Sequence, residues 1–470
     1  MLGQLCVFGR SIIIARLISP NDFGISAVFV LTVALLEMSS YLAADRFLIQ
    51  AKDGDNAELQ RTAHVIEAIR GTIIAVILFA LAWPIALLFG LPEVRWAFCC
   101  LAIVPLLNGF IHLDPKRLHR NLRFGPDASV LLIAKMGVLL LAWPLGAWLR
   151  DYSAMLWLLI TQVVIGVVLS HLVAERKYRW GWNPVYIKRI LVFGWPLALD
   201  GLLMYGILQG DRFIIGGFYT MTDLAIYSIA FGLALLPTLI VVNVTSGLLL
   251  PSFARVQDDQ VSFERSYRFS VHVLGLVGAI LVGGLILAGP RVVVLFYGSQ
   301  YSNAGYLIAL LATMNAIRLI RVPAILAALS KGDSKSPLIA NLARSTALIG
   351  AIVAATLGLD LFWIIIAGII GEVLAVGVAI YRVARLYKLS VRLLFWPVGS
   401  MLLSILVAQI CTVLWVSTGG WTMLVAVCSV FCCFFTALGL WYSRELRREA
   451  IILVMHTIRF LQGRVFQTCR

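Results

Sequence analysis

Charged residues are scarce in this chain. They make up 13% of its 470 residues, whereas hydrophobic residues make up 61%. A soluble domain averages about 25% charged and about 45–50% apolar residues. The apolar runs are spread along the whole length and leave no block of soluble-domain size between them. The composition therefore excludes a soluble enzyme that carries a single membrane anchor.

The sequence also lacks the short motifs of the common catalytic and metal sites. It contains no H-E-x-x-H, no Walker lysine and no G-x-S-x-G. Its eight cysteines show no C-x-x-C spacing, and we interpret the pairs Cys99–Cys100 and Cys432–Cys433 as small apolar side chains of helices. We therefore expect a protein that is not an enzyme and holds no metal and no cofactor. The first apolar stretch carries Arg10 and Arg16 and does not resemble a cleavable signal peptide.

Long apolar runs are abundant. They extend over about 18–27 residues, and a bilayer core of about 30 Å needs about 20 apolar residues per helix. Because lipid offers no hydrogen-bond partner and the runs do not alternate, they favour helices over barrel strands. We predict an all-α integral membrane protein with about fourteen transmembrane helices. The predicted spans are 2–18, 23–43, 70–90, 96–113, 128–148, 154–173, 194–217, 224–250, 270–296, 306–329, 338–356, 361–383, 394–416 and 422–442.

The net charge of +15 has a topological cause. Of the 38 lysines and arginines, 26 lie in the even-numbered loops between these spans and in the C-terminal tail, and only two lie in the odd-numbered loops. Cytoplasmic loops retain lysine and arginine, so this split predicts that both termini are cytoplasmic and that the number of spans is even. It also argues against a nucleic acid as partner. The basic and apolar residues of 443–470 predict an amphipathic helix on anionic membrane lipid.

The chain contains an internal repeat with an offset of 201 residues. At this offset Asp22 pairs with Asp223, and Ser19 pairs with Thr220. The third span then corresponds to the ninth and the sixth to the twelfth, which predicts two parallel pseudo-symmetric lobes. The predicted domains are an N-terminal six-helix lobe (1–173), a cytoplasmic linker (174–193), a C-terminal six-helix lobe (194–383), two further transmembrane helices (394–442) and a basic amphipathic cytoplasmic tail (443–470).

Several motifs, in order and at similar spacing, resemble those of a known family. They include A-R-L-I-S-P-N-D-F-G at Ala15 to Gly24, D-R-F-I-I-G at Asp211 to Gly216, and L-L-P-S-F-A-R-V-Q-D-D at Leu249 to Asp259. The chain resembles the polysaccharide transporter family, the Wzx-type oligosaccharide and O-antigen flippases of the multidrug/oligosaccharidyl-lipid/polysaccharide exporter superfamily. The last third resembles this family only in hydropathy.

The resemblance implies a fold and a function. The fold would be two six-helix lobes like those of multidrug and toxin extrusion (MATE) transporters, with the substrate bound between the lobes. The function would be to flip undecaprenyl-diphosphate-linked oligosaccharide repeat units across the bacterial inner membrane for exopolysaccharide or lipopolysaccharide synthesis, by alternating access. Proton or sodium is the candidate coupling ion, and a polysaccharide polymerase is a candidate partner.

Charged residues inside the spans are the candidate site residues. A charge at the membrane centre costs about 2.5–3.5 kcal/mol and therefore tends to face a cavity. Cations outnumber anions there, which suits a diphosphate and acidic sugars. The predicted substrate-binding residues are Arg318, Arg321, Lys135 and Arg10. Lys135 and Arg321 could instead snorkel to the headgroups.

Acidic residues within the spans predict a second kind of site. Glu37 and Asp200 are candidates for ion coupling, and the alternative is a salt bridge inside the bundle, for example to Arg10. Arg16 is interpreted as a structural residue near the periplasmic end of its helix. Arg344 is placed near a span boundary, at the membrane interface.

Two other functions compete with the flippase. The first is a cation-coupled multidrug exporter of the multidrug and toxin extrusion class, which usually has twelve spans and acidic lumen residues. The second is a membrane-embedded glycosyltransferase or polymerase, which would need larger periplasmic loops than this chain has.

The predicted topology can be tested by cysteine labelling. Single cysteines at Ser302 and at Lys331, in a background without the native cysteines, should react with a membrane-impermeant maleimide from opposite sides of the membrane, because one predicted span separates them. Labelling of both positions from the same side would show that the topology is wrong.

Overall fold

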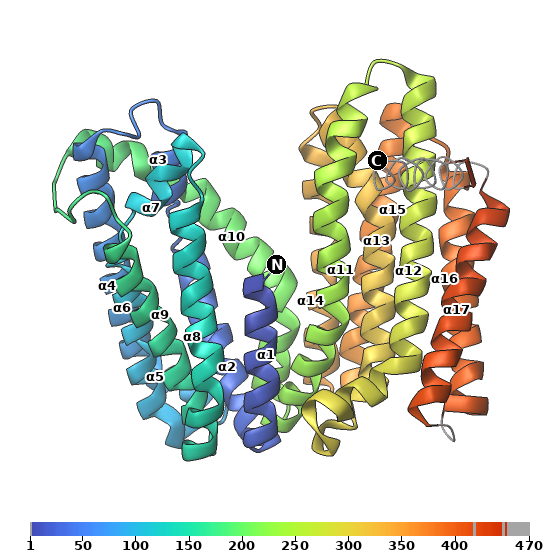
Figure 1. Ribbon diagram of the computed structural model, residues 1–470, viewed down its shortest axis with the longest axis horizontal. Coiled ribbons are helices and arrows are strands. Elements are labelled where there is room, and N and C mark those ends of the chain that lie inside the picture. Colours follow the sequence, from blue (N-terminus) through green and yellow to red (C-terminus); the bar gives the residue numbers. More distant parts are fainter. Residues whose placement is uncertain (1, 417–419, 444–446, 449–470) are drawn as a thin grey trace, which may run out of the picture. The chain divides into compact units, whose positions relative to one another are not determined.

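The computed structural model describes residues 2–416, 420–443 and 447–448, and the regular elements within these ranges are all helical (Figure 1). The helices are α1 (Leu2–Leu17), α2 (Pro20–Ser39), α3 (Ala44–Gln50), α4 (Ala57–Leu88), α5 (Arg95–Leu101), α6 (Ile103–Asn108), α7 (Asp114–Arg117), α8 (Gly125–Leu149), α9 (Ser153–Leu172), α10 (Pro184–Phe218), α11 (Met221–Arg255), α12 (Gln260–Tyr297), α13 (Ala304–Ser330), α14 (Lys335–Thr356), α15 (Leu361–Tyr387), α16 (Phe395–Cys411) and α17 (Trp421–Tyr442). Short turns of 3₁₀-helix lie at Pro92–Val94, Leu118–Asn121, Ser299–Tyr301 and Val391–Leu394, and a π-helical turn lies at Thr412–Val416.

In the described part of the chain, 12 helices are long and apolar enough to cross a membrane. The other two predicted spans coincide with α1, which has 16 residues, and with the pair α5 and α6. The span made of α5 and α6 is interrupted at Ala102. Pro105 has no N–H to donate to the carbonyl of Leu101, and its ring crowds that carbonyl. The predicted all-α membrane fold is confirmed, with fourteen as an approximate count.

Several helices begin well before the predicted spans. Helix α4 begins at Ala57, although its predicted span starts at residue 70, and α10 begins at Pro184, although its predicted span starts at 194. Asn56 and Asn183 cap these two starts, with side-chain oxygens that accept the backbone N–H of Glu58 and of Val185 at 2.8 and 2.9 Å. Hydropathy marks only the apolar part of such helices, so it misses their polar first turns.

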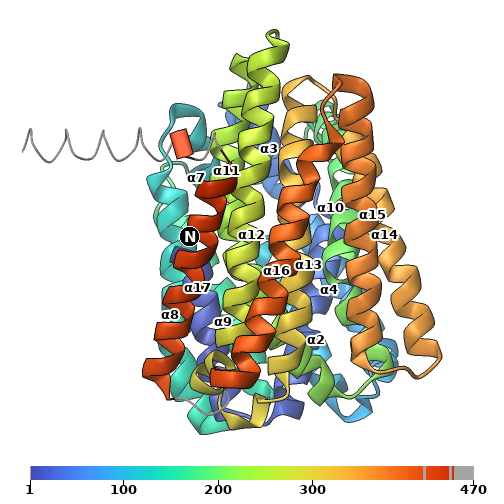
Figure 2. The same ribbon diagram turned by 90° about the vertical axis from the view of Figure 1, so that its right-hand side faces the viewer.

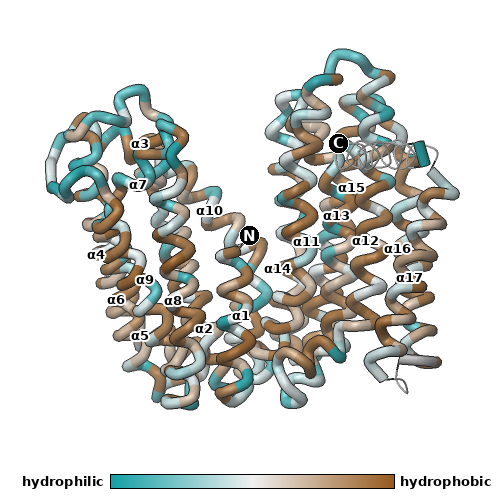
Figure 3. Tube along the Cα trace, in the orientation of Figure 1, coloured by the Kyte–Doolittle hydropathy of each residue, from teal (hydrophilic) through white to brown (hydrophobic). Residues whose placement is uncertain are grey.

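The chain forms two compact units. Unit 1 comprises Met1–Ser228 with Phe296–Gln300, and unit 2 comprises Ile229–Leu295 with Tyr301–Arg470. In unit 1, α8 packs against α9 and α1, α4 packs against α5 and α6, and α10 packs against α2 (Figure 1). Apolar residues fill the middle of these helices, whereas hydrophilic residues gather around α3 and α7 (Figure 3). The predicted domain boundaries stay a prediction.

In unit 2, the two C-terminal helices pack on α12. A row of glycines on α12 lets them approach: a Cβ on Gly275 would lie 2.5 Å from Cβ of Pro397 in α16, and a Cβ on Gly283 would lie 2.0 Å from the ring of Phe431 in α17. Ser404 of α16 also donates to the carbonyl of Ala279 at 2.5 Å. Helices α16 and α17 thus lie next to α12 and α13 (Figure 2).

The repeat is visible in the capping of α2 and α11. Ser19 Oγ accepts the backbone N–H of Asp22 at 3.1 Å and donates to its carboxylate at 2.6 Å. Thr220 and Asp223 form the same two bonds at 3.1 and 2.6 Å. A cap of this kind satisfies an N–H that has no partner within the helix. The residues paired by the 201-residue offset therefore cap the N-termini of α2 and α11 in the same way. The predicted tail helix of 443–470 falls almost entirely outside the described residues.

Asp114 ties the loops of unit 1 together. Its side chain is fully buried, and its Oδ1 accepts hydrogen bonds from Gln60 at 3.1 Å and from Arg117 at 2.7 Å. Its Oδ2 accepts the backbone N–H groups of Glu175 and Arg176 at 2.8 and 3.2 Å. This carboxylate therefore joins α4, α7 and the segment between α9 and α10.

The surroundings of Asp114 favour its ionised form. Burial alone would raise the pKa of its carboxyl group, but the bond from Arg117 and the backbone N–H groups of Glu175 and Arg176 outweigh burial and hold the pKa below its usual range. Because the folded-state pKa is the lower one, the stability this group contributes is full above the unfolded pKa of about 3.9 and is lost as the pH falls through the folded pKa.

Replacing Asp114 by Asn should therefore destabilise the protein. The amide cannot accept all four hydrogen bonds, and breaking such a buried charged network costs about 3–5 kcal/mol. Thermal unfolding of the purified protein in detergent at neutral pH should show the loss, and the difference from wild type should shrink only below about pH 4. Asp258→Asn, at an exposed carboxylate, is the control. Equal midpoints for Asp114→Asn and wild type would contradict the role of Asp114.

Candidate functional site

Three buried arginines surround one carboxylate in unit 2. Glu372 of α15 has no exposed surface, and Arg318, Arg321 and Arg344 are each 8% exposed. Arg318 and Arg344 each place Nε on Oε1 of Glu372, at 2.8 and 2.7 Å. Nη2 of Arg321 lies 3.6 Å from Oε2 of Glu372, and its Nη1 donates to Asn341 at 2.9 Å. We call Arg318, Arg321, Arg344 and Glu372 the arginine cluster.

Close helix packing positions the arginine cluster. Helices α14 and α15 approach so tightly that a Cβ on Gly371 would lie 2.6 Å from Cβ of Ala347 and 2.8 Å from the carbonyl oxygen of Arg344. Small residues allow such an approach between membrane helices. Because Gly371 adjoins Glu372, the approach brings the carboxylate of α15 against the guanidinium of α14. Arg318 and Arg321, three residues apart, reach it from one face of α13.

The arginine cluster carries more positive than negative charge. Three guanidinium groups face one carboxylate, and a guanidinium stays protonated under all ordinary conditions. Nη2 of Arg318 is buried and has no hydrogen-bond partner in the described part of the chain. An excess of buried positive charge is costly in a membrane and points to a role with anions. The cluster can therefore hold an oxyanion of a phosphate or an acidic sugar by paired N–H donors.

A second polar group lines a cavity in unit 1. The cavity has a volume of about 270 Å³ and lies between α2, α6, α8 and α9. Most of its lining is apolar, and its polar side chains are Glu37, Asn108, Lys135 and Gln162. Asn108 donates a hydrogen bond to the Glu37 carboxylate. We call this space the N-terminal cavity, and it brings one predicted ion-coupling residue and one predicted substrate-binding residue together.

Arg10 joins the N-terminal cavity through Gln162. Its side chain is 6% exposed, and Nη1 donates to Oε1 of Gln162 at 3.3 Å. The stem of Lys135 lies along α1, with Cδ 3.1 Å from the position of a Cβ on Gly3. Lys135 therefore reaches the cavity from α8, while Arg10 approaches it from α1.

The predicted residues thus fall into separate groups. Arg318 and Arg321 belong to the arginine cluster, whereas Lys135, Glu37 and Arg10 lie at the N-terminal cavity. Asp200 has an exposed side chain on α10 and joins neither group. The assignments of all these residues to substrate or ion stay predictions. The suggested pairing of Glu37 with Arg10 is not formed, because Glu37 bonds Asn108 and Arg10 bonds Gln162.

Two residues of the arginine cluster, Arg344 and Glu372, are not among the site residues predicted from the sequence. The sequence places Arg344 at the membrane interface, but the structure buries it beside Glu372, an acidic residue of the predicted span 361–383. The signal that could have found them is the G-E pair of Gly371 and Glu372 inside an apolar run, because a glycine next to a membrane carboxylate indicates a tightly packed helix contact.

Membrane-length helices with charged groups buried among them are typical of membrane transport proteins. The polysaccharide biosynthesis protein family matches residues 13–305, more than half of the chain. The chain belongs to this family, and the family resemblance predicted from its motifs is confirmed.

Relatives with assigned names are involved in polysaccharide synthesis. The succinoglycan biosynthesis transport protein ExoT of Rhizobium meliloti (strain 1021) is 26% identical over 316 residues, which cover 65% of this chain and 62% of the relative. The lipopolysaccharide biosynthesis protein WzxC of Escherichia coli (strain K12) is 22% identical over 319 residues, which cover 66% of this chain and 63% of the relative. The chain thus spans less than two thirds of the length of either protein.

Solved structures with the same fold are transporters. The lipid II flippase MurJ, in an inward closed conformation, has a TM-score of 0.74 at 12% identity, covering 93% of this chain and 97% of MurJ. An inward-facing multidrug resistance MATE family transporter of the MOP superfamily has a TM-score of 0.62 at 17% identity, covering 83% of this chain and 96% of that transporter. At these identities the likeness establishes the fold alone, and it confirms the predicted MATE-like architecture.

The charge balance of the arginine cluster can be tested by Glu372→Gln. Three guanidinium groups would then share a buried site without a carboxylate, which should cost about 3–5 kcal/mol. Arg344→Gln alone should cost less, because Glu372 keeps Arg318. The double variant should be more stable than Glu372→Gln, because one repelling charge is removed.

Thermal unfolding in detergent, followed by size-exclusion chromatography, measures these differences. Glu93→Gln, at an exposed carboxylate, is the matched control and should stay within about 0.5 kcal/mol of wild type. If Glu372→Gln unfolds at the wild-type temperature, the carboxylate does not neutralise the arginines.

Proposed function

We propose that this protein is a flippase that translocates undecaprenyl-diphosphate-linked oligosaccharide repeat units across the bacterial inner membrane. The product would supply exopolysaccharide or lipopolysaccharide O-antigen synthesis. The proposal draws on the family, on relatives named for succinoglycan and lipopolysaccharide biosynthesis, and on a fold shared with a lipid II flippase.

The observation that carries the proposal is the positive excess of the arginine cluster. A structural ion pair in a membrane would be neutral, because each uncompensated charge adds to the cost of burial. Here three guanidinium groups contact one carboxylate among the described residues, a formal excess of two positive charges within the cluster. Arginine donates two parallel N–H groups to a phosphate, so the cluster suits the diphosphate that every lipid-linked unit carries, whatever its sugars.

The N-terminal cavity supports a separate role. Glu37 is a carboxylate on an apolar cavity wall beside Lys135, and protonation or sodium binding at such a group would change the charge of the cavity. We propose Glu37 as the better candidate of the two predicted ion-coupling residues, because the side chain of Asp200 is exposed. Transport would proceed by alternating access, with both termini in the cytoplasm and a polysaccharide polymerase as downstream partner.

Loss of the gene tests the proposed function. Cells without it should accumulate the complete lipid-linked repeat unit in the cytoplasmic leaflet, measured by extraction and mass spectrometry of the lipid-linked pool. Altered dye efflux with normal surface glycan would instead favour the multidrug exporter. An incomplete glycan on the lipid carrier would favour a glycosyltransferase or polymerase.

Arg318→Ala tests the arginine cluster in the same cells. It should abolish export of surface glycan at an unchanged protein level, because Glu372 remains paired with Arg344 while a phosphate-binding guanidinium is lost. Lys135→Gln, which removes the positive charge at the N-terminal cavity, should reduce export of surface glycan. Arg385→Ala, at an exposed arginine, is the matched control. Normal export by Arg318→Ala would remove Arg318 from the substrate path.

A further inference from the structure

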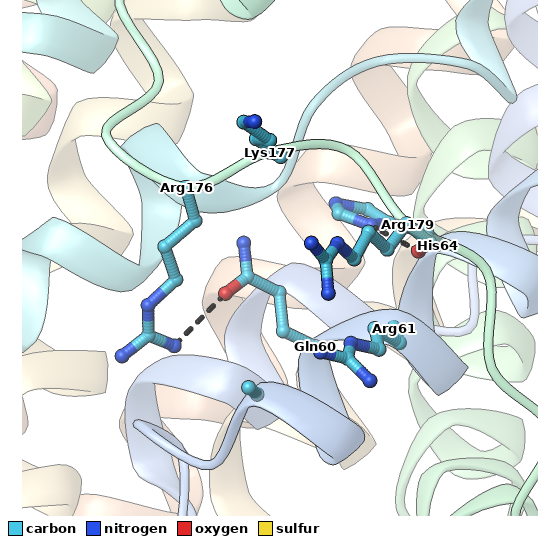
Figure 4. Close-up of a pocket in the computed structure, with 7 residues that line it drawn as sticks. Gln60, Arg61, His64, Arg176, Lys177 and Arg179 are labelled. Carbon is cyan, nitrogen blue, oxygen red and sulfur yellow. Dashed lines mark hydrogen bonds between the residues drawn. The ribbon is translucent and has the colours of Figure 1, made fainter.

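A basic pocket lies at the loop end of unit 1, apart from both groups described above. It has a volume of about 290 Å³ and is formed by the first turns of α4 and the segment between α9 and α10. Its lining includes Gln60, Arg61, His64, Arg176, Lys177 and Arg179, which come from these two segments (Figure 4). We call this space the basic pocket.

The basic pocket contains four cations and no carboxylate among its lining residues. None of the four forms an ion pair within the described part of the chain, although acidic residues are close in sequence. Those acids have other partners: Glu175 pairs with Arg117 and Arg123, and Asp55 pairs with Arg117. Arg176 donates to the carbonyl of Asp55 at 2.9 Å and to Gln60 at 3.1 Å, so the positive charge available to a ligand is mainly that of Arg61, Lys177 and Arg179.

The floor of the basic pocket is rigidly built. Gln60 is 3% exposed, and its amide is held between Asp114 and Arg176, with 3.1 Å to each. His64 is 1% exposed; its Nε2 accepts the backbone N–H of Leu113 at 3.2 Å, so its proton resides on Nδ1 and is donated to the carbonyl of Arg179 at 3.3 Å. The segment that carries the cations is thus fixed over α4, and little ordering is needed when a ligand binds.

The N-terminus of α4 also favours binding of an anion in the basic pocket. The 32-residue helix α4 begins at the pocket, and Ala57 of its first turn is part of the lining. The positive end of the helix dipole therefore adds to the field of the side chains.

The pocket also lies at the level of the membrane surface. The same segment carries Trp180 and Trp182, which are 61% and 66% exposed. Exposed tryptophans are typical of the level of the lipid headgroups. The segment joins α9 and α10, two helices that are long and apolar enough to cross a membrane, so it occupies the position at which the chain would leave the bilayer.

We propose that the basic pocket binds the phosphate of an anionic phospholipid headgroup in the leaflet that adjoins it. The two non-bridging oxygens of a phosphodiester share one negative charge and accept hydrogen bonds, and the lining residues Arg61, Lys177 and Arg179 are positively charged donors. Free inorganic phosphate offers the same chemistry from solution, but the exposed tryptophans at the pocket favour the lipid.

The experiment uses the full-length protein in a neutral detergent. Short-chain phosphatidylglycerol, short-chain phosphatidylcholine and inorganic phosphate are titrated separately, and binding is read from thermal stability and from lipid adducts in native mass spectrometry. Phosphatidylglycerol should bind and stabilise the protein, whereas phosphatidylcholine and inorganic phosphate should have a much weaker effect.

Lys177→Gln combined with Arg179→Gln tests the location of the site. Both side chains are exposed, so the unliganded variant should unfold at the wild-type temperature, while its affinity for phosphatidylglycerol should fall roughly thirtyfold. Lys335→Gln combined with Lys388→Gln removes the same charge at exposed positions in unit 2 and should leave the affinity unchanged.

Three results would overturn the proposal. Equal losses in the two double variants would mean that phosphatidylglycerol responds only to total charge. Binding of inorganic phosphate as tight as that of phosphatidylglycerol would assign the pocket to a soluble anion. Absence of any phosphatidylglycerol effect on wild type would exclude a lipid site. None of these readouts depends on transport.

Discussion

The structure of unit 2 depends on the contact between Glu372 and three guanidinium groups. A single buried carboxylate makes it possible for Arg318, Arg321 and Arg344 to share the interior of a membrane bundle. The contact requires α13, α14 and α15 to lie close together, and Gly371 provides the close approach. Because the charges cannot be dispersed without exposing them to lipid, this contact constrains how the three helices can move against one another. It also leaves the positive excess that an anionic substrate could compensate.

The two halves place polar groups on equivalent helices. By the repeat, α6, α8 and α9 of the first half correspond to α13, α14 and α15 of the second. The first set supplies Asn108, Lys135 and Gln162 to an open cavity, and the second supplies the arginine cluster to a closed contact. The repeat therefore preserved the positions of the polar helices while their chemistry diverged. One half retains space and mixed charge, and the other retains excess positive charge, which is consistent with separate roles in coupling and in anion binding.

The pattern of apolar and charged residues along the sequence predicted the membrane fold well, but it predicted only part of the arginine cluster. Apolar runs located the membrane helices because each span must be apolar on its own. The three-residue spacing of Arg318 and Arg321 placed both on one face, because helix geometry is local. The contact of Arg344 with Glu372 joins residues of different helices. It depends on how closely α14 and α15 pack, and the periodicity of apolar residues along the sequence does not reveal that distance. The polar first turns of α4 and α10 were missed for a related reason: caps and tertiary contacts stabilise them, not lipid.

For the lysines and arginines of the loops, the sequence likewise explains their number but not their contacts. Membrane topology requires only that lysines and arginines remain on one side, so it explains how many there are. It does not explain why some are neutralised and others are not. Arg189 is paired with Asp53 at 2.7 Å, and Arg117 is paired with Asp114 at the same distance. The cations of the basic pocket instead surround an opening above a fixed floor. Like charges held together in a rigid setting repel one another, and this arrangement costs free energy unless an anion occupies the space between them.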